Sequence, residues 1–355
     1  MMKFDKFFRK LLAAFAAISA MSALTACNGL IYNDEGDCDP YYKVRFRYDM
    51  NMKWADAFAS EVNSVTLYVI DAETGKIVRT ISESGDELKA EGYLMDVDVP
   101  PGRYHLHAWC GDGRDSHFTI PESDIHSGLT CSLNAEHRDD ALLHSSVQLE
   151  HLYHGLTTDV EFPDEEGVHT FTVNLTKDTN DVNVVLQHTS VDLDKDTYSF
   201  SITSPNAELD HLNNLTSDET VWYHEHYKDH GSADVVIPDR SDDIEFTSTS
   251  TPQSRETINT VRSCIASLTT SRLVKGTDTQ LTIRNNNTGE LVFSMPLIDY
   301  VLMTKGNYRR PMTDQEYLDR QDKFDIVLFL DDNNGWAKVQ IYINSWKIVQ
   351  QNSDL

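Results

Sequence analysis

The residues with the clearest chemistry lie near the start of the chain, where a cysteine follows three residues that a signal peptidase reads: Leu24, Thr25 and Ala26, then Cys27. A basic start and an apolar stretch precede them, which is typical of a secretory signal peptide over residues 1–26. We expect Cys27 to become the amino terminus and to carry diacylglycerol on its thiol and an acyl group on its amine, a stable membrane anchor. The alternative is an ordinary signal peptide cleaved nearby.

The residue after Cys27, the net charge and the chain length limit which cell compartment and which kinds of partner are expected. Asn28 follows Cys27, whereas many inner-membrane lipoproteins have aspartate there, so the outer membrane is predicted. Residues 27–40 form a lipidated, acidic and flexible tether that favours the cell-surface side. The net charge of −27 makes nucleic-acid binding unfavourable, and 355 residues exceed one ordinary hydrophobic core, so two domains are expected.

The other cysteines predict structure rather than chemistry. Export to an oxidising compartment permits disulfides, and Cys110 with Cys131 closes the shortest structured loop among the three pairings of Cys38, Cys110, Cys131 and Cys264. Cys110 and Cys131 are therefore the candidate disulfide. Their spacing contains no Cys-x-x-Cys, which argues against a zinc ribbon or redox site.

Fourteen histidines raise the question of a metal. Two pairs place alternate imidazoles on one strand face: His105 with His107, and His224 with His226. A zinc site needs a third and usually a fourth ligand, which the sequence does not supply. We expect no metal, and no cofactor apart from the covalent lipid on Cys27.

Motifs for catalysis are missing. There is no Gly-x-Ser-x-Gly elbow and no glycine-rich phosphate loop. Acidic pairs such as Glu165-Glu166 and Asp331-Asp332 are expected by chance in so acidic a chain and indicate solvated loops. The sequence predicts a binding or structural protein and not an enzyme.

The elements that must position these residues are strands. Apolar residues alternate with polar ones over residues 42–48, 65–69, 104–108, 171–175, 182–186 and 198–202. The polar break at residues 177–180 divides the chain into an N-terminal sandwich, 41–177, and a C-terminal sandwich, 178–355. Residues 313–320 predict a short helix capped by Thr313, residues 256–273 fit a helix or a strand, and residues 326–330 predict a central strand. The fold class is all-β, two sandwiches in tandem.

The carboxy-terminal segment, residues 337–350, is apolar and alternating. Its apolar residues are Val339, Ile341, Ile343, Trp346 and Ile348. The segment either completes its own sandwich or is offered to the open sheet edge of a neighbouring subunit.

Four stretches, in order, resemble the FimB-type anchor subunits of type V fimbriae. They are the lipobox with its acidic tether, residues 99–111 with Pro101-Gly102 and Trp109, residues 315–330, and residues 341–349. The resemblance implies two tandem transthyretin-like β-sandwich domains, no catalysis, and fimbrial shaft or accessory subunits as partners. It also implies that Cys27 is the anchor in the outer membrane and that the carboxy-terminal strand is the candidate donor to the first shaft subunit. Ser345 stands where a glycine-like or small polar residue is expected.

Two alternatives make different structural predictions. A surface lipoprotein that binds glycans or host ligands would expose a platform of aromatic residues such as Trp54, Trp222 and Tyr223. A hydrolase would place two carboxylates in a cleft. An anchor would have neither, and its last strand would lie at a sheet edge.

Overall fold

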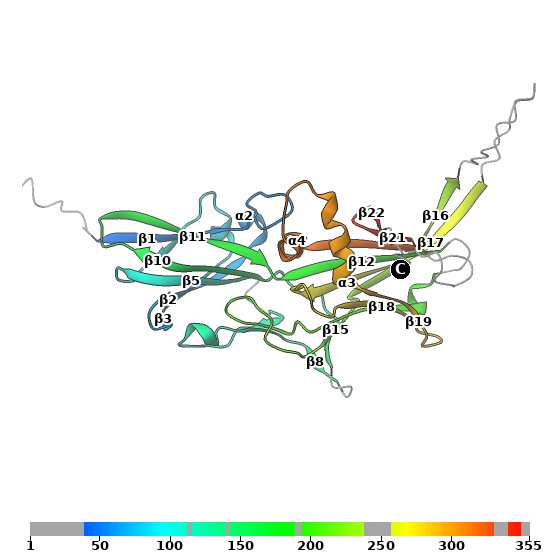
Figure 1. Ribbon diagram of the computed structural model, residues 1–355, viewed down its shortest axis with the longest axis horizontal. Helices are drawn as coiled ribbons and strands as arrows, with labels where there is room; N and C mark the ends of the chain where they lie inside the picture. The colour runs from blue at the N-terminus through cyan, green and yellow to red at the C-terminus, as the bar shows by residue number, and fades with distance from the viewer. Residues whose placement is uncertain are drawn as a thin grey trace, which may run out of the picture.

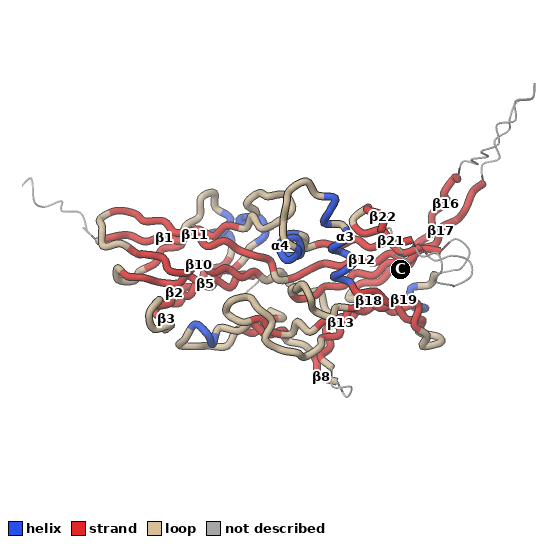
Figure 2. Tube along the Cα trace, viewed as in Figure 1, coloured by secondary structure: helices blue, strands red, loops and turns tan. Residues whose placement is uncertain are grey.

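The computed structural model describes residues 39–111, 116–138, 142–188, 193–237, 257–329 and 340–348. Two β-rich bodies follow one another along the long axis of the molecule (Figure 1). Strands make up most of each body, and the few helices are short (Figure 2). Within the described ranges, no helix has the length and apolar content needed to cross a bilayer.

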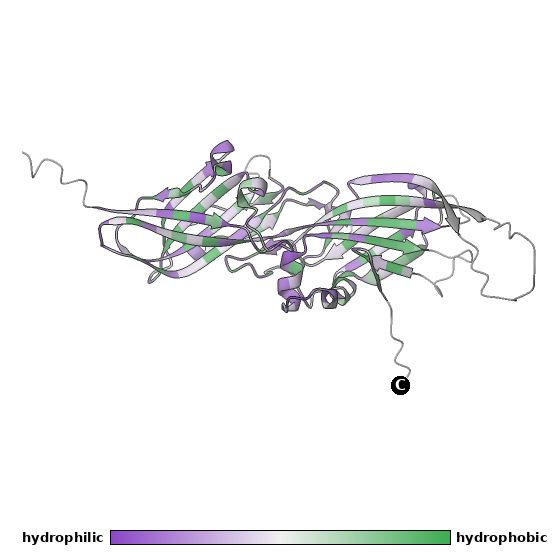
Figure 3. Ribbon diagram, turned by 90° about the horizontal axis from the view of Figure 1, so that it is seen from above, coloured by the Kyte–Doolittle hydropathy of each residue, from purple (hydrophilic) through white to green (hydrophobic). Residues whose placement is uncertain are grey.

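The first sandwich is built on one seven-stranded sheet. Its strands, in spatial order, are β3 (Ile77–Ser84), β2 (Ser64–Asp71), β5 (Gly102–Gly111), β10 (Tyr153–Phe162), β11 (Gly167–Lys177), β1 (Pro40–Arg47) and β4 (Met95–Val97). Two short helical turns, α2 (Phe58–Glu61) and η1 (Asp86–Lys89), pack beside it. Alternate residues such as Val44, Leu67 and Leu106 form its core, and the hydropathy alternates along the strands (Figure 3).

The second sandwich contains two six-stranded sheets. The first has the order β16 (Tyr227–Ile237), β17 (Thr257–Ser271), β12 (Thr179–His188), β20 (Lys323–Phe329), β21 (Gln340–Ile343) and β22 (Trp346–Ile348). The other has the order β19 (Leu291–Pro296), β18 (Gln280–Asn285), β13 (Tyr198–Ser204), β15 (Val221–His224), β9 (Leu143–Ser145) and β8 (Glu136–His137). The turn η3 (Lys195–Thr197) precedes β13.

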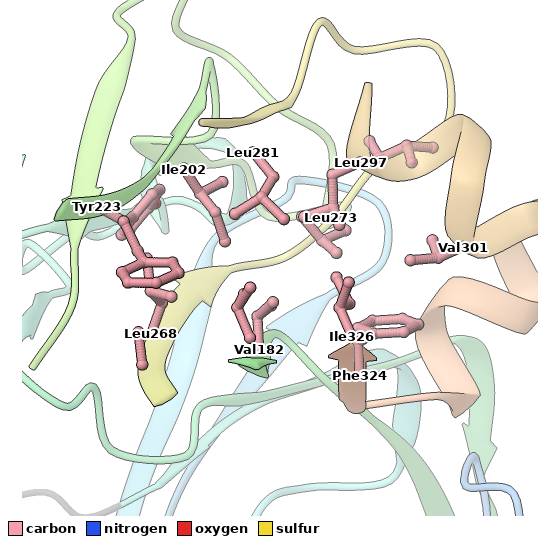
Figure 4. Packing of buried hydrophobic residues seen from close by; sticks show 14 of the residues in the cluster. Val182, Ile202, Tyr223, Leu268, Leu273, Leu281, Leu297, Val301, Phe324 and Ile326 are labelled. Carbon is pink, nitrogen blue, oxygen red and sulfur yellow. The ribbon is translucent and has the colours of Figure 1, made fainter. Parts of the chain in front are cut away.

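The core of the second sandwich lies between its two sheets. Val182 and Ile326 from one sheet face Ile202 and Leu281 from the other (Figure 4). Helix α3 (Leu297–Met303) adds Leu297 and Val301 to this core, and η4 (Lys305–Asn307) follows it.

A crossover segment, which we define as residues 116–152 except the undescribed 139–141, links the two bodies. It contains β6 (Phe118–Thr119), η2 (His126–Gly128) and β7 (Cys131–Leu133), and β14 (Glu208–Leu209) joins β6 and β7 in a three-stranded sheet. Its strands β8 and β9 belong to a sheet of the second sandwich. The predicted division at residues 177 and 178 coincides with the end of β11 and the start of β12, and the crossover segment is the part of 41–177 that packs with the second sandwich.

Most of the predicted elements are present. The helix after Thr313 is confirmed as α4 (Asp314–Arg320), with the Thr313 hydroxyl accepting a hydrogen bond from the Glu316 amide at 3.0 Å. Residues 256–273 are mostly strand, β17, which pairs with β16 on one side and β12 on the other, because their β-branched residues favour a strand. Strand β20 is central, between β12 and β21, but its residues alternate between buried and less buried instead of being buried on both faces. The all-β fold of two tandem sandwiches is confirmed.

Candidate functional site at the carboxy-terminal edge and the domain junction

The carboxy-terminal strands form a hairpin at the edge of a second-sandwich sheet. Strand β21 pairs antiparallel with β20, and β22 pairs antiparallel with β21 and ends the sheet. The two turn residues, Asn344 and Ser345, both have positive φ, 47° and 69°, which is the backbone of a type I′ hairpin turn. Such a turn favours glycine at its second central position, so Ser345 holds a left-handed backbone conformation that is costly for a serine. The Asn344 amide and carboxamide oxygen bond the backbone of Asp325 at 2.8 Å each, which ties the turn to β20.

The structure resolves part of the question about the candidate donor strand. Ile341 and Ile343 are buried in the core of their own sandwich, so β21 completes its own domain. Trp346 and Ile348 lie on β22, whose outer side has no strand partner among the described residues, and Val339 lies outside them. Donation to another subunit stays a prediction, and the edge available for it is β22.

The lipobox residues 24–27 and Cys38 lie outside the described residues. The candidate disulfide between Cys110 and Cys131 is wrong: both are free, buried thiols. The physical reason is that Cys110 points into the core of the first sandwich, whereas Cys131 on the crossover segment packs into the second core. The short separation of Cys110 and Cys131 in the sequence therefore does not place their thiols in the same core.

The first of two buried polar clusters lies where β11 passes into β12. We call Asp178, Asn213, Arg272 and Asp319 the arginine cluster. Arg272 donates to both carboxylate oxygens of Asp319 at 2.9 Å and lies 3.6 Å from Asp178 Oδ1. The Asn213 carboxamide donates to the same oxygen of Asp178 at 2.9 Å. Burial raises the pKa of the Asp178 carboxyl to about 7, although the Arg272 charge and the Asn213 hydrogen bond act in the opposite direction.

Two further contacts hold the sandwiches together beside this cluster. Arg320 of α4 donates to the carbonyl of Asp49 at 2.9 Å, and its guanidinium carbon lies 3.4 Å from the centre of the Trp54 ring. Lys177 is buried at the end of β11 and forms an ion pair of 2.7 Å with Asp322. These contacts are polar and directional, so they fix the orientation of one sandwich against the other.

The second buried cluster brings together imidazoles from three parts of the fold. We call His107 of β5, His154 of β10, His126 of η2 and His211 of the turn after β14 the imidazole cluster. The ring centres lie 4.8 Å apart for His107 and His154, 5.2 Å for His107 and His126, and 4.5 Å for His126 and His211. The predicted neighbour His105 lies at its rim, with its ring 6.0 Å from that of His126.

The other histidine pair does not converge. His224 stacks on His144 and on Trp222, and the His144 and His224 ring nitrogens lie 2.9 Å apart, while the backbone amide of His226 bonds to Ser267 on β17. No group of three donor side chains in the described part of the chain has metal-binding geometry.

The aromatic platform expected of a glycan binder is not formed by the residues nominated for it. Tyr223 is fully buried and donates to Asn206 Oδ1 at 2.7 Å. Trp54 lies between the guanidinium groups of Arg310 and Arg320. The expectation of an exposed Tyr223 is wrong because β15 turns that residue toward the second core, as Figure 4 shows.

Carboxylates line two of the hollows that the described residues form. One of about 310 Å³ is lined by Glu61 and Glu150, and both carboxylates are occupied: Glu61 accepts from Tyr153 at 3.1 Å, and Glu150 accepts from Ser116 at 2.5 Å. A larger one of about 630 Å³ is lined by Glu208, Asp218 and Glu219, and Glu208 accepts from Ser132 at 2.7 Å and from Thr216 at 2.6 Å. The nominated acids Glu165 and Glu166 are exposed and line neither hollow, and 331–332 lie outside the described residues.

Comparison with known proteins places this architecture in a family. The chain matches the family model of fimbrillin-A associated anchor proteins over residues 34–352. The minor fimbrium anchoring subunit Mfa2 of Porphyromonas gingivalis is 22% identical over 352 residues, covering 96% of this chain and 95% of that protein.

Solved structures agree on the fold. A candidate adhesin of Bacteroides thetaiotaomicron superimposes with a TM-score of 0.71 at 31% identity, covering 87% of this chain and 98% of the other. The fimbrial anchor protein Mfa2 of P. gingivalis superimposes with a TM-score of 0.60 at 18% identity, covering 88% and 99%. The chain therefore belongs to the family of fimbrillin-A associated anchor proteins, which makes it a structural and non-catalytic fimbrial subunit of the cell envelope.

Proposed function

We propose that this protein anchors a fimbria to the outer membrane through a lipid on Cys27, and that it joins the fimbrial shaft by strand exchange at β22. The observation that carries the proposal is the separation of the two attachment points. Strand β1, which begins 13 residues after Cys27, lies in the first sandwich, whereas β21 and β22 lie in the second (Figure 1). The membrane attachment and the shaft attachment are thus on different bodies.

The edge strand gives the chemistry of the shaft contact. An unpaired strand edge presents N–H and C=O groups that another chain can pair with. In a hairpin with a two-residue turn, the residues flanking the turn, Ile343 and Trp346, exchange hydrogen bonds. The backbone of the next residue, Lys347, then faces away from β21, toward an incoming strand. The proposed partner is a shaft or accessory subunit whose open sheet edge pairs with β22, so that the carboxy-terminal strand is the one donated.

The lipid attachment is tested in the native host with Cys27→Ala. We expect fimbriae to be shed into the medium or to grow abnormally long, because the base of the shaft is no longer held by acyl chains. Cells and medium are probed for the shaft protein, and Cys38→Ala is the matched control. Fimbriae that stay on the cells unchanged while this protein alone is released would exclude anchoring, and glycan binding would be tested next.

The edge contact is tested separately with Lys347→Pro, which removes one outward N–H and leaves the bonds between Ile343 and Trp346 in place. Lys347→Ala, which keeps the amide, is the control. We expect Lys347→Pro to stay cell-bound while fimbriae detach. Normal fimbriae on Lys347→Pro cells would overturn the edge contact without touching the lipid anchor.

A further inference from the structure

The imidazole cluster is buried at the meeting point of three chain segments. His107 and His154 project from the outer face of the first sandwich, His126 comes from the crossover segment, and His211 comes from the turn over residues 210–213 that follows β14. His107 is completely buried, and His154 and His126 are 6% and 9% exposed. The cluster is therefore the packing contact between the first sandwich and the segments that cover it.

Four of the eight ring nitrogens of the cluster are buried with no hydrogen-bond partner among the described residues. Both ring nitrogens of His107, Nε2 of His126 and Nδ1 of His211 are buried and unpartnered, and so is the indole nitrogen of Trp109, whose ring packs on His107 and His154. Within the cluster, His154 Nε2 bonds the His211 carbonyl oxygen at 3.2 Å. Unsatisfied buried nitrogens stabilise nothing, so the cluster is held by ring packing and this hydrogen bond.

The charged groups around the cluster do not offset the repulsion that arises when a second imidazole of the cluster is protonated. On the turn, the carboxylate of Asp210 favours protonation of His126 and His154, whereas Arg272 opposes it at His154. On β5, His105 faces His126, and on β2 the ring of Tyr68 faces His107 at 5.9 Å. The imidazoles also repel one another when protonated.

Burial decides the protonation state. It lowers the pKa of His107 well below its usual range and lowers the pKa of His126 and of His154 to about 4. An imidazole in water has a pKa of about 6.5. An opened cluster therefore binds protons between pH 6.5 and 4 that the closed cluster does not bind, and acid shifts the equilibrium toward the opened form.

Beside the cluster, backbone hydrogen bonds join the crossover segment to residues 75–77 of the first sandwich and to the residue before β14. The amide of His126 donates to the Gly75 carbonyl at 2.9 Å, the amide of Ile77 donates to the Asp124 carbonyl at 2.9 Å, and the amide of Leu133 donates to the Ala207 carbonyl at 2.8 Å. Strands β6, β7 and β14 have only two or three residues each. Local opening here costs less than unfolding of either sandwich.

We propose that the imidazole cluster is an acid-sensitive latch, which holds the crossover segment and the 210–213 turn on the first sandwich at neutral pH and releases them in mildly acidic surroundings. The release frees β6, η2 and β7, and with them Cys131 from its contact with the second core, while the first core and the two six-stranded sheets stay folded. The latch needs no metal and no ligand, because protons alone supply the differential binding.

Three buried thiols report on the latch from inside the molecule. Cys131 lies on β7 of the crossover segment, Cys110 lies in the first core, and Cys264 lies in the second. The full mature chain is pulsed with a pyridyl disulfide, which reacts with thiols in weak acid, from pH 7.5 to 5.0. The modified residues are identified by mass spectrometry, with rates normalised to the unfolded chain.

We expect labelling of Cys131 to accelerate about tenfold or more between pH 7 and 5, as the linked protonation shifts the opening equilibrium, while Cys110 and Cys264 stay protected. His107→Phe with His126→Phe keeps the ring packing, loses no described hydrogen bond and removes two of the three imidazoles whose pKa burial lowers, so its Cys131 rate rises much less with acid. The exposed His137→Phe behaves as the parent does. His126→Phe alone gives a smaller reduction of the same response should the double variant fail to fold.

Two results would overturn the latch. One is a Cys131 rate in the parent that does not change with pH. The other is acceleration that is not reduced in the His→Phe variants, or that includes Cys110 and Cys264, because acid would then be acting elsewhere or on the whole fold.

Discussion

The arginine cluster and the imidazole cluster lie on either side of the 210–213 turn, and both are buried between the sandwiches. In the arginine cluster, Arg272 has carboxylate partners on both sides, so removing one member leaves a buried charge. In the imidazole cluster, four of the eight ring nitrogens are buried with no described partner, so His107 and His126 are replaceable by apolar rings. Burial also moves their pKa values in opposite directions along the pH scale, upward for Asp178 and downward for the imidazoles.

This difference teaches that two buried polar contacts in one junction can have opposite dependences on pH. Raising the pH from 4 to 7 weakens the arginine cluster, because burial keeps Asp178 protonated in the folded protein whereas the unfolded chain releases that proton at a lower pH. Lowering the pH from 6.5 to 4 weakens the imidazole cluster. Because three imidazoles titrate against one carboxyl, the junction is most secure near neutral pH and weakens on acidification.

The largest expected effect comes from Arg272→Met. The substitution leaves the buried Asp178 and Asp319 without their cation and should lower the free energy of unfolding by about 3 to 5 kcal/mol. Urea denaturation measures it, with Arg284→Met on the exposed face of β18 as the control. A loss no greater than that of the control would mean that the arginine cluster does not stabilise the junction.

A smaller effect is expected from Asp178→Asn, which keeps an oxygen to accept from Asn213 but cannot ionise. Relative to the parent, the variant should gain on the order of 2 kcal/mol between pH 4 and 8, because only the parent must release a proton inside the protein. Unfolding curves across this range measure the gain, and the exposed Asp98→Asn is the control. A difference that is constant with pH would contradict the raised pKa.

For His126→Phe, we expect the gain in stability over the parent to grow as the pH falls, which is the opposite of Asp178→Asn. At pH 7 the variant and the parent should have the same stability, and at pH 5 the variant should be more stable by about 1 kcal/mol, because burial lowers the pKa of His126 to about 4. Thermal unfolding at the two pH values measures this. Parallel behaviour of the variant and the parent would show that His126 titrates normally.

The smallest expected effect is the coupling between the clusters. Combining Asp178→Asn with His126→Phe should give additive changes in the free energy of unfolding within about 0.5 kcal/mol at pH 7, because no described contact joins the two side chains. A double-mutant cycle measures the coupling. An interaction above about 1 kcal/mol would mean that the 210–213 turn makes the two clusters one network.

Local patterns predicted the parts of the structure that depend on local rules. Alternation identified the strands because a sheet with one buried face requires it, and Thr313 identified the start of α4 because the orphan amides of a first turn need an acceptor. Helix α3 was not predicted, because its apolar residues follow the strand β19 without a capping residue: Pro296 precedes it and makes no side-chain cap.

The junction clusters depend on residues distant in sequence and were only partly visible. His105 and His107 were recognised as one face of a strand, but His126, His154 and His211 come from other elements. One signal was present: His105, His107 and Trp109 put three large rings in a row on the outer face of β5, where a solvated face would have small polar residues. Such a row indicates a covered face.

The single residue between β11 and β12 has a mechanical consequence. A pull on the amino-terminal tether enters at Pro40 and passes sideways from β1 to the parallel β11 across eight registered residue pairs. It then runs through Asp178 into β12 and across a second parallel ladder into β20. Both ladders are loaded in shear, so their hydrogen bonds must fail together rather than one by one. Because only one residue lies between the two strands, the chain passes tension from the first ladder to the second with little extension.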